Sequence, residues 1–194
     1  MVYTVITLLL LLLGGVTLLP RFKHIVKNYE TGINFFLTIV ATLVGVFLAI
    51  SISNFESEQK EKQDVIKLLR AAIASVETSL DYSQKLESYY KTLPKDSELL
   101  ETFYDKNPLP FPGYIETFLT QNIVSRNLSE PSLTELNELI INLKRTRASD
   151  TEIYIRLLDL SQKTLQAEIE LQQGKINPVQ LEQHLDELGQ KLTI

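Results

Sequence analysis

The chain has 194 residues, a net charge of −5 at pH 7, and neither cysteine nor tryptophan. The lack of cysteine excludes disulfides, iron–sulfur clusters and thiolate zinc sites, and it leaves the redox compartment open. Nucleic-acid binding needs a cluster of lysine and arginine, so the acidic balance argues against a nucleic-acid partner. Hydrophobic residues make up 44% of the chain and are concentrated before about residue 54. The sequence therefore predicts a membrane part, 1–54, followed by a soluble helical domain, 55–194.

The first hydrophobic segment, residues 2–19, reads VYTVITLLLLLLGGVTLL. A cleaved secretory signal peptide is one interpretation of such a segment. A signal peptide normally has basic residues before the apolar run and a small-residue cleavage site after it. Here no lysine or arginine precedes the run, and Pro20-Arg21-Phe22 follows it. We therefore expect a retained transmembrane span, with cleavage as the alternative.

A short connector, residues 20–33, carries three basic residues, Arg21, Lys23 and Lys27. Short loops rich in lysine and arginine stay on the cytoplasmic side of a membrane. These three residues therefore predict a multi-pass protein of the inner cell membrane whose helical domain is extracytoplasmic. The basic residues that follow the second span weaken this prediction, because they favour the opposite orientation.

The second hydrophobic segment, residues 34–53, is long enough to cross a bilayer as a helix. Small side chains recur at every fourth position in it, at Ala41, Gly45, Ala49 and Ser53. A stripe of small residues lets another helix approach closely in lipid. We expect this face to pack either against a second copy or against residues 2–19. Neither segment contains Asp, Glu, Lys, Arg or His, which is typical of anchoring rather than of ion or proton transport.

The rest of the chain has apolar residues at spacings of three and four and no alternating, strand-like pattern. The fold class is therefore all-α: an N-terminal two-helix transmembrane hairpin, then a small antiparallel bundle with a long juxtamembrane helix. Proline, glycine and helix-capping residues give the expected helices as residues 56–93, about 114–126, 131–174 and 178–192. Gly174 is the expected C-cap of the third of these helices, and Asn177-Pro178 starts the last one. Ser149 and Glu152 also form a capping box, at which the helix 131–174 could break.

The proline-rich segment at residues 108–113, PLPFPG, cannot form a regular helix. It could be a linker, a packed corner or a loop that recognises a partner. Leu109, Phe111 and Tyr114 alternate with the prolines and glycine, and such apolar residues favour the packed corner.

The sequence carries no motif typical of catalysis or of metal binding. His24 and His184 have no other metal ligands at suitable spacing, and no glycine-rich phosphate loop or G-x-S-x-G motif occurs. The basic patch at residues 144–147, KRTR, could meet an acidic partner or anionic lipid, or could simply complement the end of a helix. We expect no catalytic residue, no cofactor and no metal.

Two stretches show a wider resemblance. FFLTIVATLVGVFLAISISNFESEQKEKQDVIKLLRAAIASVE and FPGYIETFLTQNIVSRNLSEPSLTELNEL resemble elements of a loose group of uncharacterised bacterial membrane-anchored helical proteins. The likeness covers about residues 21–145, and the additional N-terminal span departs from the single-span layout of that group. The resemblance implies no activity, because the group has none assigned.

The sequence thus favours a membrane-anchored helical scaffold without catalytic activity. Its expected partners are the lipid bilayer and either a second copy or another membrane protein. Two alternatives stay open: a pore-forming or bilayer-perturbing effector of the toxin or defence type, and a ligand-sensing helical domain.

Overall fold

The computed structural model describes residues 5–9, 12, 15, 30–96 and 100–190. Within these residues the chain is helical, and no strand occurs. It divides into two compact units, residues 1–60 and 61–194. The prediction of an all-helical protein is confirmed for the described residues.

The helix α3 runs from Glu30 to Thr92, a length of 63 residues. No proline occurs within it, and its threonine hydroxyls bond to its own backbone: Thr38 donates to the Asn34 carbonyl and Thr42 to the Thr38 carbonyl, both at 2.8 Å. The second predicted span and the predicted helix 56–93 are therefore parts of one helix. α3 begins four residues before the expected second span, so residues 30–33 of the predicted connector 20–33 are helical. The helix can start there because nothing in Glu30–Ile33 blocks helical backbone.

The N-terminal part of α3 is long and apolar enough to cross a membrane. Its most apolar window has a mean hydropathy of 2.6, and only 6% of that window is buried. A core helix of a water-soluble protein would bury most of such a window, so this explanation does not fit. Large side chains such as Phe35, Ile52 and Phe55 are instead more than half exposed.

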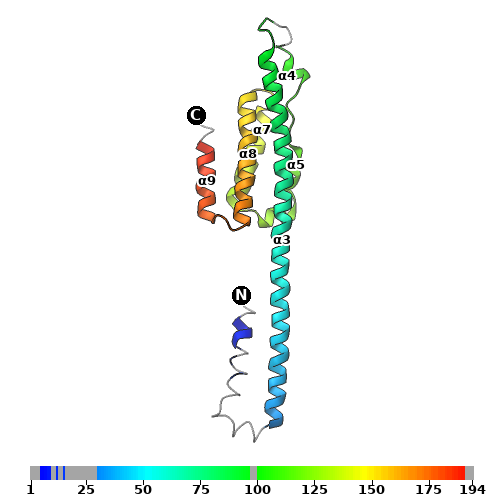
Figure 1. The fold of residues 1–194 in the computed structure, drawn as a ribbon, viewed down its shortest axis with the longest axis vertical. Coiled ribbons are helices and arrows are strands. Elements are labelled where there is room, and N and C mark those ends of the chain that lie inside the picture. The colour runs from blue at the N-terminus through cyan, green and yellow to red at the C-terminus, as the bar shows by residue number, and fades with distance from the viewer. Residues whose placement is uncertain (1–4, 10–11, 13–14, 16–29, 97–99, 191–194) are drawn as a thin grey trace. The chain divides into compact units, whose positions relative to one another are not determined.

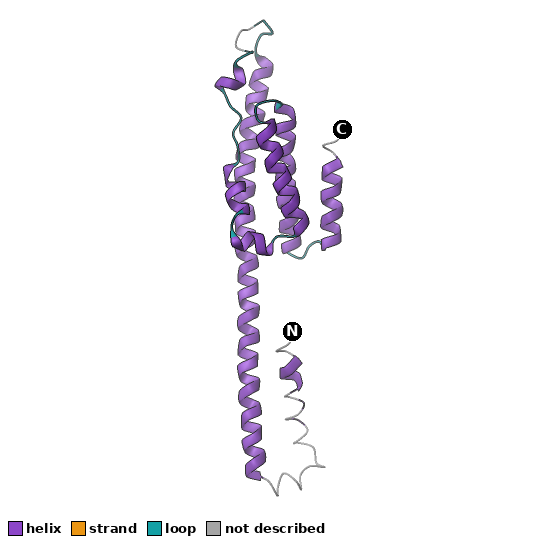
Figure 2. Ribbon diagram, turned by 180° about the vertical axis from the view of Figure 1, so that it is seen from behind, coloured by secondary structure: helices purple, strands orange, loops and turns teal. Residues whose placement is uncertain are grey.

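The C-terminal unit contains six helices after α3 among the described residues (Figures 1 and 2). These are α4 (Phe103–Lys106), α5 (Gly113–Leu119), α6 (Asn122–Asn127), α7 (Glu130–Thr146), α8 (Thr151–Gln172) and α9 (Pro178–Gln190). α7 and α8 pack along each other, and α9 contacts both of them at one edge of the unit. α5 contacts α6 and α7.

The core of this unit is formed by apolar side chains from α3 and from the helices α5 to α9. α3 contributes buried residues at spacings of four and three, namely Val65, Leu69, Ala72, Val76, Ser79 and Ser83. Because three of these six are small alanine or serine residues, a hydrophobicity pattern alone does not reveal the buried face of α3 beyond Val76. Ile73 and Leu80 lie beside this stripe and are only partly buried.

The predicted helix 114–126 is wrong in one respect, because two short helices occupy this stretch. α5 ends at Leu119, and the extended residue Gln121 begins α6. The Thr120 hydroxyl donates to the Thr117 carbonyl at 2.8 Å and so occupies a backbone acceptor at the end of α5. The break lets α5 and α6 bury Phe118 and Val124 in the same core.

The predicted helix 131–174 is interrupted at residues 147–150, beside the break that Ser149 and Glu152 indicated. Asp150 is the N-cap of α8, where its carboxylate accepts the Ile153 N–H at 2.9 Å. The turn brings α8 back along α7, so that the apolar stripes of both helices are buried against each other. One continuous helix would leave these stripes in water.

The signals at the end of α8 and the start of α9 are correct. Gly174 has φ of 70°, a left-handed conformation that suits glycine after a helix, and the Lys175 N–H reaches the Glu170 carbonyl at 2.9 Å. Asn177 and Gln180 form a reciprocal capping box, with two bonds of 2.9 Å between side chain and backbone. α9 ends at Gln190 in the described range, and the predicted residues 191–192 lie outside it.

Candidate functional site

The predicted helix-packing residues lie on an exposed face of α3. Ala41, Gly45, Ala49 and Ser53 are all exposed, and a Cβ atom added to Gly45 would meet nothing within 4 Å. The other side of this stretch is more covered within the N-terminal unit: Val40 is buried and its face includes the half-buried residues Ile33, Leu37, Val44, Phe47 and Ser51. From the 3.6-residue repeat, the two faces point in clearly different directions.

The predicted topology determinants Arg21, Lys23 and Lys27 lie outside the described residues. The same holds for His24 and for most of the first predicted span, of which residues 5–9, 12 and 15 are described as helical. The orientation prediction therefore stays a prediction.

The proline-rich segment is held as a packed corner by two side chains from the α7–α8 region. The Arg147 Nε donates to the Leu109 carbonyl at 2.5 Å, and the Tyr154 hydroxyl donates to the Pro110 carbonyl at 2.7 Å. Leu109 and Tyr154 are fully buried. Burial raises the pKa of Tyr154 to about 12, although the nearby Arg147 charge acts in the opposite direction. The Leu109 and Pro110 carbonyls have no helical hydrogen-bond partner, because proline keeps this segment out of regular helices. The two side chains supply the donors that these carbonyls need.

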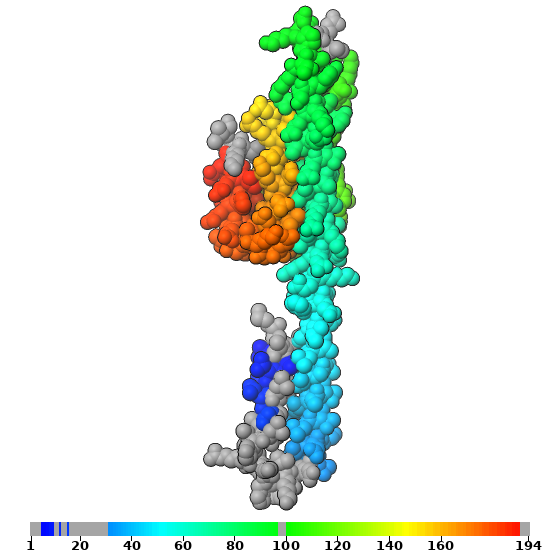
Figure 3. Space-filling view, viewed as in Figure 1, coloured from blue at the N-terminus to red at the C-terminus, as the bar shows by residue number. Residues whose placement is uncertain are grey.

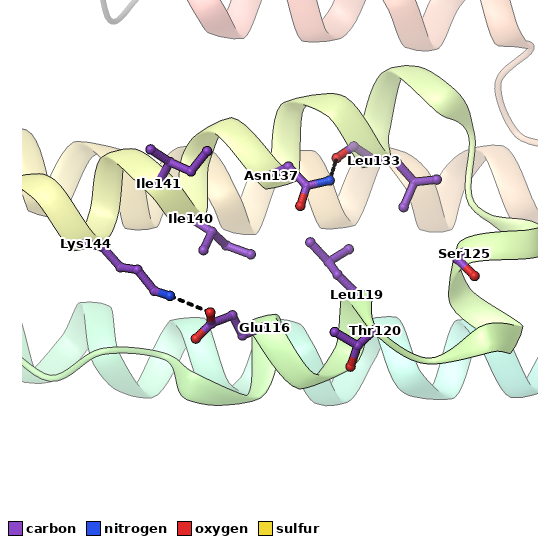
Figure 4. A pocket seen from close by; sticks show the side chains of 9 residues that line it. All are labelled: Glu116, Leu119, Thr120, Ser125, Leu133, Asn137, Ile140, Ile141 and Lys144. Carbon is purple, nitrogen blue, oxygen red and sulfur yellow. Dashed lines mark hydrogen bonds and ion pairs between the residues drawn. The ribbon is translucent and has the colours of Figure 1, made fainter.

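A surface groove lies between α5 and α7 and extends to α6 (Figure 4). It has a volume of about 520 Å³, and its polar side chains include the ion pair of Lys144 with Glu116. Its apolar lining comes from Leu119, Leu133, Ile140 and Ile141. Ile141 is 66% exposed. The groove thus combines an apolar wall with one pair of opposite charges.

The basic patch at residues 144–147 is largely engaged in local structure. Besides pairing with Glu116, the Lys144 ammonium lies 5.7 Å from the centre of the Phe111 ring. Arg147 is used by the proline-rich corner, and the Thr146 hydroxyl donates to the Asn142 carbonyl. The Lys144–Glu116 pair is about half exposed, so its contribution to stability is small.

A buried carboxylate that no sequence pattern singles out joins α8 to the start of α7. Glu168 is fully buried and accepts hydrogen bonds from the Ser129 N–H at 3.2 Å, the Ser129 hydroxyl at 2.6 Å and the Gln172 amide at 2.8 Å. Ser129 is also the N-cap of α7 and accepts the Ser132 N–H. A negative charge at a helix N-terminus is favourable, because backbone N–H groups point toward it. The arrangement explains how a glutamate is tolerated in this core.

Two buried hydroxyls belong to the same region: Thr164 precedes Glu168 by one turn of α8, and Ser132 follows Ser129 by three residues on α7. Ser132 Oγ on α7 and Thr164 Oγ1 on α8 are buried without a hydrogen-bond partner among the described residues. Thr164→Val should therefore leave the free energy of unfolding unchanged or raise it by up to about 1 kcal/mol, because it removes a polar atom that makes no bond. Chemical denaturation of the full chain in detergent measures this.

The matched control is Thr146→Val on α7, which removes a hydroxyl that does donate a hydrogen bond. The free energy of unfolding of this control variant should fall by about 0.5–1.5 kcal/mol. Equal losses for both variants would contradict the assignment of Thr164 as unpaired.

The titratable residues of α9 and its neighbours do not converge on a metal site. Among the described residues no group of three or more His, Cys, Asp or Glu side chains could hold a metal ion. His184 lines a smaller groove of about 310 Å³ between α8 and α9, together with Lys163, Glu170 and Leu188. His184 is thus exposed and lies beside a neighbouring helix.

Comparison with family models, with curated proteins and with solved structures finds no match to this chain.

Proposed function

We propose that this protein is a membrane-anchored helical scaffold without catalytic activity, and that its second span associates with another copy of itself. The observation that carries this proposal is the distribution of exposure around the apolar part of α3. The face of Ala41, Gly45, Ala49 and Ser53 is open, whereas the face around Val40 is covered within the N-terminal unit. In lipid, a face of small residues gains most from a second helix backbone.

In this proposal the first hydrophobic segment, residues 2–19, forms a transmembrane hairpin with α3. It covers the Val40 face and leaves the small-residue face for the second copy. The C-terminal unit acts as an antiparallel helical bundle that contacts partners outside the cytoplasm, and the basic connector lies inside. Reporter fusions after Ile194 test this orientation. A reporter that is active only outside the cytoplasm should give a signal. A signal from a reporter that is active only in the cytoplasm would show the opposite orientation.

Gly45→Leu should weaken self-association of the full chain in membranes by roughly tenfold or more, because a loss of about 1.4 kcal/mol of helix packing is already a factor of ten. The leucine side chain would hold the two helices apart at the centre of the small-residue face. Energy transfer between labelled copies in vesicles measures the association as a function of protein-to-lipid ratio.

Two further variants make this test specific. Ala49→Leu lies on the same face and should have the same effect. Leu43→Phe enlarges an exposed side chain on a different face and should leave association unchanged. If Leu43→Phe is as harmful as Gly45→Leu, the small-residue face is not the contact.

The chain has no cysteine, so single-cysteine variants give an independent test without background. Gly45→Cys and Ala49→Cys should form disulfide-linked dimers in oxidised membranes, and Val44→Cys should not. Cross-linking from Val44 alone would place the contact on the face that we assign to residues 2–19. Depolarisation of cells on overproduction, lost in Gly45→Leu, would instead favour the pore-forming alternative.

A further inference from the structure

The groove between α5 and α7 lies on a different face of the C-terminal unit from the one that α3, α8 and α9 form. These three helices make up most of the face seen in Figure 3, whereas the view from behind shows α7 in front with α5 beside it (Figure 2). The lining of the groove comes from α5, α6, α7 and Thr120, and α8 and α9 contribute none of it. The groove is therefore open to a partner on this face.

The apolar part of this surface has both a recess and a projection. Leu119 and Leu133 line the recess and are only partly buried. Ile141, on the α7 side, is the most exposed large apolar side chain among the described residues of this unit, at 66%. A contact that takes both the recess and Ile141 out of water is favourable, because it buries apolar surface.

The charges of the groove cancel each other. Lys144 on α7 and Glu116 on α5 lie on opposite sides of it near one end, and each is about half exposed (Figure 4). The other polar lining residues, Thr120, Ser125 and Asn137, carry no charge. A strongly acidic or strongly basic partner would meet one like charge for each opposite one. A partner that carries the same two charges in reversed positions would meet an opposite charge at both places.

A second copy of this chain has that arrangement. A twofold axis along the groove places α7 of each copy over α5 of the other, so that Lys144 faces Glu116 of the second copy and Glu116 faces its Lys144. The same rotation brings Ile141 of each copy into the contact. The surface is thus complementary to itself in charge, and it buries the exposed isoleucine twice.

We propose that the α5–α7 groove is a second contact between copies of this chain, in addition to the contact between spans. The groove is smaller than a standard protein interface, so the contact is weak between free molecules. It gains strength when the copies are held close together in one membrane. In this respect it rests on the proposed anchoring.

Charge reversal tests the contact in the full chain in vesicles, by energy transfer between labelled copies. Lys144→Glu should weaken association by roughly fivefold, because two exposed pairs in each dimer change from attraction to repulsion. Glu116→Lys should weaken it by a similar factor. A mixture of Lys144→Glu donor copies with Glu116→Lys acceptor copies should restore association to near its natural level.

The mixture separates a contact between copies from a role within one chain. In each variant residues 116 and 144 of the same chain carry like charges, so the pair within the chain stays broken in the mixture. Between two different variants, however, every facing pair is again of opposite sign. Restored energy transfer therefore comes only from pairing between copies.

The exposed isoleucine supplies a second arm. Ile141→Ser should weaken association by roughly fivefold, because each dimer loses two buried side chains. Val179→Ser is the matched control, since Val179 is similarly exposed at 64% but lies on α9, outside the groove. The control should leave association unchanged.

The same measurements in the Gly45→Leu background keep this proposal apart from the contact between spans. If Gly45→Leu alone has no effect while the mixture restores association, the span contact is wrong and the groove contact stands. The groove proposal is overturned if the mixture associates no better than either variant alone, a result that would leave the groove to a different partner. It is also overturned if Ile141→Ser has no more effect than Val179→Ser.

Discussion

Replacing Glu168 with alanine should lower the free energy of unfolding of the C-terminal unit by about 2–4 kcal/mol. The substitution removes the acceptor for the Ser129 N–H, the Ser129 hydroxyl and the Gln172 amide, in a place that water does not reach. Ser129 and Gln172 are partly buried, and the Gln172 amide keeps its bond to the Asn127 carbonyl, so the main loss is at the two Ser129 donors. Leaving such donors without partners costs more than the net gain from making the bonds. The measurement is urea denaturation of the full chain in mild detergent, followed by tyrosine fluorescence.

Two comparisons distinguish the role of the Glu168 carboxylate from a general effect on α8. Glu170→Ala removes a partly exposed carboxylate from the same helix and should cost less than about 0.5 kcal/mol. Glu168→Gln keeps the size of the side chain but replaces one acceptor oxygen with a donor. Its loss of stability should therefore fall between the losses of Glu168→Ala and Glu170→Ala. A Glu168→Ala variant as stable as Glu170→Ala would show that the three hydrogen bonds do not hold the start of α7.

The second large effect is a loss of stability at alkaline pH, which Tyr154 causes. Its pKa is raised to about 12 in the folded protein, against about 10 for a tyrosine in an unfolded chain. The folded state therefore keeps a proton that the unfolded state loses, and stability falls as the pH rises from 10 to 12. Two pKa units correspond to roughly 2–3 kcal/mol of unfolding free energy. This contribution is fully present below pH 10 and is lost by about pH 12.

Tyr154→Phe isolates this contribution, because phenylalanine keeps the ring and cannot ionise. At pH 7 the variant should lose about 1–2 kcal/mol, since the Pro110 carbonyl loses its hydrogen-bond donor. Between pH 10 and 12 its stability should fall less steeply than that of the natural protein, and the two curves should converge. Parallel curves over this range would mean that Tyr154 ionises in the folded state at an ordinary pH.

Local sequence signals determined much of the helical architecture. The glycine at 174 and the Asn177-Pro178 start mark helix ends that depend on backbone conformation and on side-chain caps, and both depend on only a few neighbouring residues. The apolar, charge-free stretch 34–53 likewise predicts a helix that could span a membrane from composition alone.

The break at Gln121 and the buried polar contacts could not be predicted in this way, whereas the capping residues Ser149 and Glu152 did indicate a helix start near the second break. The interruptions at Gln121 and at 147–150 are favourable because they bring apolar stripes from separate helices together, and the energy of that packing is not local. Ser79 and Ser83 belong to the buried face of α3 although their side chains are polar, because a small side chain fits the space between helices.

The sequence by itself determined that this protein is all-helical in its described residues, that it has an apolar helix long enough for a bilayer, and where several helices begin and end. These properties follow from local propensity, capping and hydrophobicity. Only the tertiary structure decided that Arg147 and Tyr154 hold the proline-rich corner, and that Glu168 is buried at the start of α7. Each of these contacts joins residues distant in sequence, and their energies depend on burial, which a single stretch of sequence does not specify.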